Sequence, residues 1–135
     1  METCIASALP LAQAQQLNAQ FAAAAQRVYD EWDESNIDVY AGGGICHLIA
    51  DALFAVCDEN GIEASTVSST QEQHVYVICR LANGVYALDI PYHLYEVGSM
   101  FSWKKIHDVQ FTADFITWFC VDGNPANYEQ YIDEC

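Results

Sequence analysis

Residues 74–91, HVYVICRLANGVYALDIP, decide the fold of this chain. Two runs rich in β-branched and aromatic residues flank Asn83-Gly84, a pair that is typical of the turn of a β-hairpin. Alternate residues in each run form wholly apolar sets, so we predict that both sets face one core. These residues are Val75, Val77, Cys79 and Leu81 in the first strand, and Tyr86, Leu88 and Ile90 in the second.

His74 and Asp89 fall together on the other side of this predicted hairpin. A two-residue turn made of Asn83 and Gly84 would pair Ala82 with Val85 and leave them too far apart, about 13 Å along the strand. A four-residue connection, residues 81–84, pairs Arg80 with Val85 and makes His74 and Asp89 diagonal neighbours, with about 7–8 Å between backbones. The register of the hairpin therefore decides whether this histidine and this carboxylate can interact.

Upstream lies AGGGICHLIADALFAVC, residues 41–57, where three glycines run into Cys46. An apolar stripe predicts a helix over 45–59 that stops at Asn60-Gly61. The partial positive charge of a helix N-terminus favours a thiolate, and its N–H groups can face an oxyanion. Cys46 therefore has the surroundings of a nucleophile, although it can also be simply the first residue of the stripe. The stripe comprises Cys46, Ile49, Ala50, Leu53, Phe54 and Cys57.

A cysteine nucleophile needs a base, and the base needs an orienting group. The histidines are His47, His74, His93 and His107. His47 follows Cys46 directly, faces another side of the helix and can pair with Asp51 at i+4. The two later histidines fall in loop-like segments. His74 is thus the candidate base, and Asp89 is its orienting carboxylate. The alternative is that His74 is a surface histidine at a strand end and that Asp89 merely terminates its strand.

GGGICHLIADAL, followed by HVYVICRLANGVYALDIP, resembles the core of transglutaminase-like and papain-like thiol enzymes, over about residues 40–92. The resemblance implies a central helix that opens with the cysteine and packs on an antiparallel sheet. It also implies Cys46 as nucleophile, His74 as base and Asp89 as orienting carboxylate. The family's usual aromatic after the cysteine is His47 here. For the oxyanion we expect the Cys46 backbone N–H plus an unidentified donor, because the upstream candidates are only Gln13, Gln15, Gln16, Gln20, Gln26 and Tyr40.

The remaining segments complete an α+β prediction. Residues 11–34 form a helix after Pro10, with strands at 62–69, 74–81, 85–90 and 115–121 and a short helix within 126–135. We predict one papain-like domain over 1–135, with its core at about 40–122. In it, N-terminal helices and the Cys46 helix pack on an antiparallel sheet.

The chain has 19 acidic and four basic residues, a net charge of −15, which disfavours direct binding to nucleic acid. The charge serves solubility, a basic partner or mimicry of a polyanion. No apolar run is long enough to span a membrane, and Met1-Glu2-Thr3 lacks the basic start of a secretory signal, so we expect a cytoplasmic protein. No CxxC pair occurs, and we expect Cys57, Cys79 and Cys120 to be buried free thiols.

The leading hypothesis is a small thiol enzyme acting on an amide or acyl bond of a protein or peptide, and the net acidity favours a basic one. Protease, deamidase and acyl or amine transferase remain open, as does the oligomeric state. The alternative is an acidic binding or inhibitor module, with Tyr92, Tyr95, Phe101 and Trp103 as a contact loop around Gly98. A zinc site using Cys46, His47 and His74 or His93 matches no closed ligand spacing. We expect neither metal nor cofactor.

Overall fold

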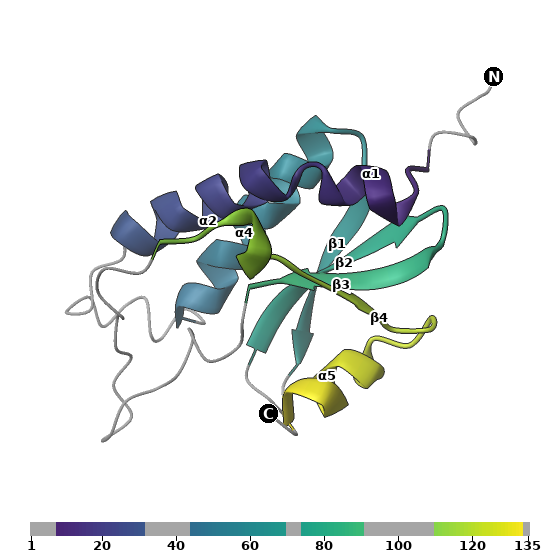
Figure 1. Ribbon diagram of the computed structural model, residues 1–135. Helices are drawn as coiled ribbons and strands as arrows, with labels where there is room; N and C mark the ends of the chain where they lie inside the picture. Colours follow the sequence, from purple (N-terminus) through teal and green to yellow (C-terminus); the bar gives the residue numbers. More distant parts are fainter. Residues whose placement is uncertain (1–7, 32–43, 70–73, 91–109, 134–135) are drawn as a thin grey trace.

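The computed structural model describes residues 8–31, 44–69, 74–90 and 110–133, with side chains described in all of these except residues 44–46, 69 and 132–133. These residues form a four-stranded antiparallel sheet, in the order β1-β2-β3-β4, with helices on both faces (Figure 1). The α+β class predicted from the sequence is confirmed.

The strands are β1 (Glu63–Ser69), β2 (His74–Leu81), β3 (Gly84–Asp89) and β4 (Thr117–Cys120). The helices are α1 (Leu11–Gln15), α2 (Asn18–Glu31), α4 (Gly44–Glu59) and α5 (Ala126–Asp133), and a 3₁₀ turn, η4 (Ala113–Phe115), precedes β4. Among these described elements, no helix is long and apolar enough to cross a membrane.

The β2–β3 hairpin has the register that brings His74 and Asp89 together. Arg80 pairs with Val85, the register expected for the longer connection. The predicted turns are wrong, however, because Leu81 pairs with Gly84, so that residues 82–83 alone form the turn. Helix α1 is attached at this turn. The Leu11 N–H donates to Asn83 Oδ1 at 2.7 Å.

The main core lies between α2 and α4 on one side and the sheet on the other. Phe21 of α2, Leu53 of α4 and Leu88 of β3 are fully buried there. The predicted apolar set of the hairpin faces this core, with Val75 only partly buried. The sequence pattern therefore gave the correct face for every one of these positions.

Helix α4 and strand β2 run in the same direction. Gly61, with a φ of +73°, ends the helix in the left-handed region, and the Ile62 N–H donates to the Cys57 carbonyl at 2.9 Å. β1 then returns along α4, and β2 pairs antiparallel to β1. Cys57 Sγ lies 3.7 Å from Cys79 Sγ, which fixes the level of the helix along the strand.

Helix α5 covers the opposite face of the sheet (Figure 1). Tyr128 packs there with Tyr76, Ala87 and Val121. The helix begins where its sequence predicts a start, because Asn124 Oδ1 accepts from the Ala126 N–H and a proline stands between them.

The predicted helix over 11–34 is wrong in one respect, since α1 and α2 are separate. The N–H groups of Gln16 and Leu17 bond to carbonyls three residues back, which tightens the chain into a turn. The residues at the break are good helix formers, so tertiary packing and not propensity decides it. Residues 32–34 lie outside the described residues.

Two burial predictions are also wrong. Phe54 is 37% exposed, while Val56 is 7% exposed and belongs to the core. Phe54 lies at the edge of the α4 stripe, about 100° from Leu53. Cys120 is exposed, unlike Cys57 and Cys79, which are buried free thiols as predicted. β4 is an edge strand of the described sheet, so its apolar run is not enclosed on all sides.

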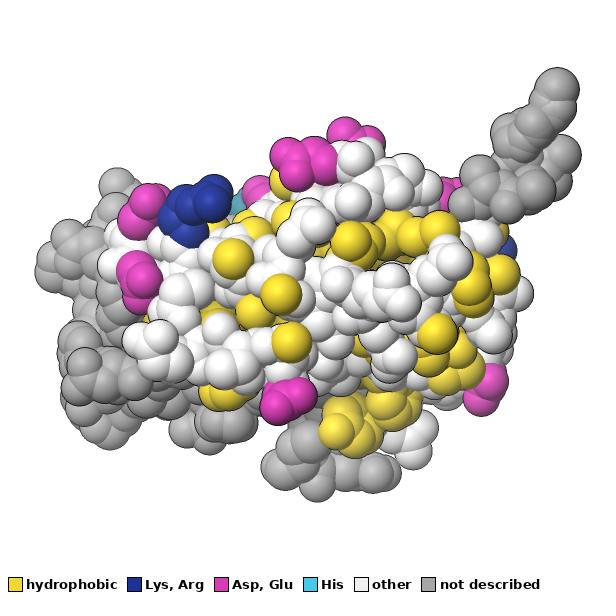
Figure 2. All heavy atoms as spheres, turned by 45° about the horizontal axis from the view of Figure 1, so that its top comes forward, with side chains coloured by type: hydrophobic (Ala, Val, Ile, Leu, Met, Phe, Trp, Pro, Cys, Tyr) yellow, Lys and Arg dark blue, Asp and Glu magenta, His cyan; other side chains and the backbone are white. Residues whose placement is uncertain are grey.

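Charge is spread over the surface. Figure 2 shows Asp and Glu side chains scattered across the visible face, separated by uncharged surface. On this face the described acidic side chains are therefore dispersed and do not form one acidic patch.

Candidate functional site

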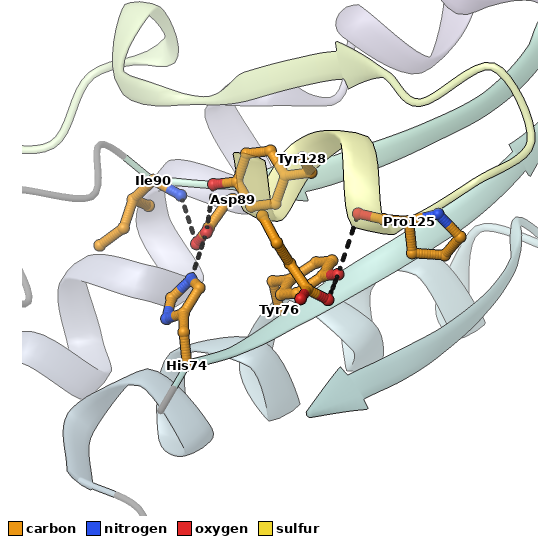
Figure 3. A network of polar contacts seen from close by, with 7 residues as sticks. His74, Tyr76, Asp89, Ile90, Pro125 and Tyr128 are labelled. Atoms are coloured by element: carbon orange, nitrogen blue, oxygen red, sulfur yellow. Dashed lines mark hydrogen bonds and ion pairs between the residues drawn. The ribbon is translucent and has the colours of Figure 1, made fainter. Parts of the chain in front are cut away.

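The structure brings His74 and Asp89 together at one end of the sheet. His74 is the first residue of β2 and Asp89 is the last of β3. His74 Nε2 lies 2.8 Å from Asp89 Oδ2 (Figure 3). The two residues are 2% and 1% exposed, so this is a buried pair and not the surface histidine of the alternative interpretation.

Strand parity places the pair on the face covered by α5. The imidazole of His74 stacks on the ring of Tyr76, two residues along β2, with 5.7 Å between ring centroids and 19° between planes. The histidine therefore lies against an aromatic surface that restricts its rotation.

The Asp89 carboxylate is held by donors from different parts of the chain. Oδ2 accepts from His74 and from the Tyr128 hydroxyl, the latter at 2.6 Å. Oδ1 accepts from the Ile90 N–H at 2.9 Å. Burying a carboxylate is costly unless such bonds replace its hydration, and bonds to a charged acceptor are the strong ones.

The phenols beside the pair keep their protons. Burial in the first place, and then the neighbouring Asp89 carboxylate, raise the pKa of Tyr128 far above its ordinary value. Burial and the bond to Glu129 likewise raise the pKa of Tyr76, whose hydroxyl donates to Glu129 Oε2 at 2.8 Å. Tyr128 therefore acts on Asp89 as a neutral hydrogen-bond donor.

The bond to Asp89 also fixes the role of His74 Nε2. A carboxylate accepts only, so Nε2 carries a proton and donates it to Asp89 Oδ2. An imidazole oriented in this way can take a proton at Nδ1 and carry the resulting charge next to Asp89.

Cys46 lies in the first turn of α4, as the third residue of the helix. Its side chain lies outside the described residues. His47 Nε2 is 3.4 Å from Asp51 Oδ2, and both side chains are about half exposed, so the predicted surface pair is present. His93, His107 and the aromatic segment around Gly98 also lie outside the described residues.

The upstream glutamines have other roles. Those of α1 (Gln13 and Gln15) and the following Gln16 lie where α1 joins the 82–83 turn, at the opposite end of the hairpin from His74. Gln20 accepts from Asn60, and Gln26 Oε1 accepts from the Phe111 N–H at 2.7 Å. Tyr40 lies outside the described residues. The oxyanion donor beside the Cys46 backbone N–H remains unassigned.

Sequence reasoning missed Tyr128, Tyr76 and Glu129. One signal was present, because Tyr76, Ile78, Val85 and Ala87 give the second face of the hairpin an apolar character as well. Strands that are apolar on both faces are covered on both sides. A covering segment was therefore required, and only α5 supplies it among the described elements.

The buried thiols are poor candidates for a nucleophile. The hydrogen bond with Cys57, followed by burial, raises the pKa of Cys79 far above its ordinary value. In the described part of the chain, no group of three or more His, Cys, Asp or Glu is arranged to hold a metal ion.

No protein-family model matches the chain, and neither the curated proteins nor the solved structures give a match. The site therefore has to be interpreted from its own geometry.

Proposed function

We propose that this protein is a thiol enzyme that acts on an amide or acyl bond, with Cys46 as nucleophile, His74 as base and Asp89 as orienting carboxylate. The observation that carries the proposal is the buried His74–Asp89 pair, with 2.8 Å between Nε2 and Oδ2. Buried titratable pairs are costly to maintain and cluster at functional sites.

The position of Cys46 in α4 supports its role. From Cys57, which touches Cys79, the helix rises about 16 Å back to residue 46. From Cys79, β2 extends about 17 Å back to His74. Because α4 and β2 run in the same direction, these ideal lengths support a position for residue 46 near the His74 end of the sheet.

Helical geometry adds a second argument. Eleven residues turn a helix through nearly whole revolutions, so position 46 lies on the side of α4 that Cys57 presents to the sheet. His74 belongs to the opposite face of the sheet, but it is a terminal strand residue. A thiol at this level would approach Nδ1 around the end of β2 and not through the sheet.

These positions define a reaction. The Cys46 thiol gives its proton to His74 Nδ1, and the thiolate forms a C–S bond to the substrate carbonyl carbon while the carbonyl π pair moves to oxygen. Collapse of the tetrahedral intermediate expels the amine or alcohol, which takes the proton from His74. The acyl group then passes from sulfur to water or to an amine. This series of reaction steps agrees with the resemblance to transglutaminase-like and papain-like enzymes.

The charge of −15 favours a basic protein or peptide as substrate. A diffuse negative field accelerates encounter with cations, and the acceleration falls as salt rises. The surface alone would equally suit an acidic binding module, and it is the buried pair that favours the enzyme.

The decisive experiment follows the alkylation of Cys46 by iodoacetamide against pH, with mass spectrometry of each cysteine peptide. Wild type and His74→Gln are compared, and the exposed Cys120 is the internal reference. We expect rapid modification of Cys46 near pH 6 that His74→Gln slows. If Cys46 reacted only with the pH profile of an ordinary thiol, whose pKa is about 8.5, the proposal would be overturned.

Turnover is tested with an activated ester, p-nitrophenyl acetate. We expect acetylation of Cys46 and continued release of nitrophenol, both lost in Cys46→Ala. A binding module would keep its partner in Cys46→Ala, and its wild type would give no acyl-enzyme.

A further inference from the structure

The Asp89 carboxylate is the point where α5 meets the proposed site. Tyr128 comes from α5 and His74 from β2, and both reach the same oxygen, Oδ2, at 2.6 Å and 2.8 Å (Figure 3). Tyr128 is 1% exposed, so its hydroxyl makes this bond away from bulk solvent, where a hydrogen bond is electrostatically stronger than in water.

A further contact of the carboxylate is local. Ile90 is the residue after Asp89, and its N–H holds Oδ1. That contact ties one oxygen to the adjacent backbone and does not by itself aim the other oxygen at His74. Tyr128 supplies a donor from a distant part of the chain, on the oxygen that the imidazole uses.

Helix α5 is itself firmly placed, which gives the hydroxyl a fixed position. The Tyr128 ring packs against Tyr76, with 4.9 Å between centroids, and against Phe119, with 5.6 Å. The Tyr76 hydroxyl donates to Glu129, the next residue of the helix. The position of the carboxylate therefore depends on the docking of α5.

We propose that Tyr128 is a positioning residue, which orients the Asp89 carboxylate and so keeps the His74 proton on Nε2. The proposal rests on the function proposed above, because it assigns to α5 the task of preparing the base. Loss of the hydroxyl removes this donor from Oδ2. We then expect the carboxylate to hold Nε2 less firmly and the Nε2-protonated tautomer of His74 to become less populated.

The test is Tyr128→Phe, which keeps the buried ring and removes only the donor. Long-range ¹H–¹⁵N NMR of His74 measures the tautomer without substrate and without Cys46. We expect wild type to hold the proton on Nε2 and Tyr128→Phe to give a mixture of tautomers. We also expect Cys46 alkylation at pH 6 to slow about tenfold, the effect of losing one hydrogen bond to a charged group.

Tyr131→Phe is the matched control. It removes a hydroxyl from the same helix at a ring that is 45% exposed. It should leave both the tautomer and the alkylation rate unchanged.

The outcomes separate the two proposals. A wild-type tautomer in folded Tyr128→Phe would overturn the positioning role, whatever the reactivity of Cys46. An ordinary Cys46 in wild type would overturn the enzyme, while the NMR measurement still decides the coupling of Tyr128 to His74. If Tyr128→Phe does not fold, wild type decides, because the Tyr128 hydroxyl proton must cross-relax with the His74 Nε2 proton and its absence would refute the contact.

Discussion

The two faces of the sheet are built differently. Toward α2 and α4 the strands present apolar side chains such as Val77 and Leu88, and the packing is extensive. Toward α5 the same strands present His74, Tyr76 and Asp89, which are joined by hydrogen bonds to Tyr128 and Glu129. Adjacent residues of one strand, Leu88 and Asp89, thus belong to different environments, one apolar and the other polar and hydrogen-bonded.

The largest effect is expected at Asp89. Asp89→Asn keeps the shape of the side chain, but its amide donates toward Nε2 and forces the imidazole proton to Nδ1. Turnover of p-nitrophenyl acetate should fall by about 10²–10⁴, the range for the wrong tautomer in a triad. Steady-state assays, with circular dichroism to confirm folding, check this. Unchanged turnover would remove Asp89 from the site.

The adjacent position on the other face should behave in the opposite way. Leu88→Ala leaves a cavity at a residue that is 0% exposed and should cost about 2–5 kcal/mol of unfolding free energy. Urea unfolding measures the cost. The pH profile of Cys46 alkylation in the folded fraction should match wild type, and a shifted profile would mean that the two faces are not independent.

Alkaline pH should selectively lower the contribution of the α5 face to the free energy of unfolding. Burial and Asp89 raise the pKa of Tyr128 in the folded state above its ordinary value of 10.0, so the unfolded state loses this proton first as pH rises. Its stabilising contribution is complete below pH 10 and declines above it, by about 1.4 kcal/mol per pH unit. Chemical unfolding at a series of pH values above 10 tests this.

The same pH series should be measured for Tyr128→Phe. This variant lacks the titrating hydroxyl, so its unfolding free energy should decline less steeply above pH 10 than that of wild type. A slope equal to that of wild type would place the alkaline loss on other groups, such as Tyr76, whose pKa is also raised by burial.

The smallest effect is expected at the start of α5. Asn124→Ala removes the oxygen that accepts from the Ala126 N–H, and should cost about 1 kcal/mol. Hydrogen exchange should accelerate in α5 and not in α4. Equal acceleration in both helices would show that the two faces unfold as one unit.

The local sequence pattern was enough to predict much of this structure. Alternation in residues 74–90 predicted both strands and the face of each residue, and Asn60-Gly61 predicted the end of α4. The signal was strong because strand alternation has a period of two residues, and a shift by one would expose the whole apolar set. The break between α1 and α2 and the exposed Phe54 were missed, since neither residue type nor spacing encodes them.

The candidate site could be predicted from the sequence to a similar extent. The chain order Cys46, His74, Asp89 and strand parity named the pair, but two registers of the hairpin were open, and only one allows contact. The pairing of Arg80 with Val85 resolved that choice. Tyr128 could not have been found, because nothing local links residue 128 to residue 89.

The sequence by itself thus determined the hairpin, its core face and the candidate pair, because these depend on neighbours along the chain. The tertiary structure decided the register, the burial of His74 and Asp89, and the arrival of Tyr128 at Oδ2. Such contacts between distant segments arise only when separate elements pack together, so no short stretch of sequence contains them.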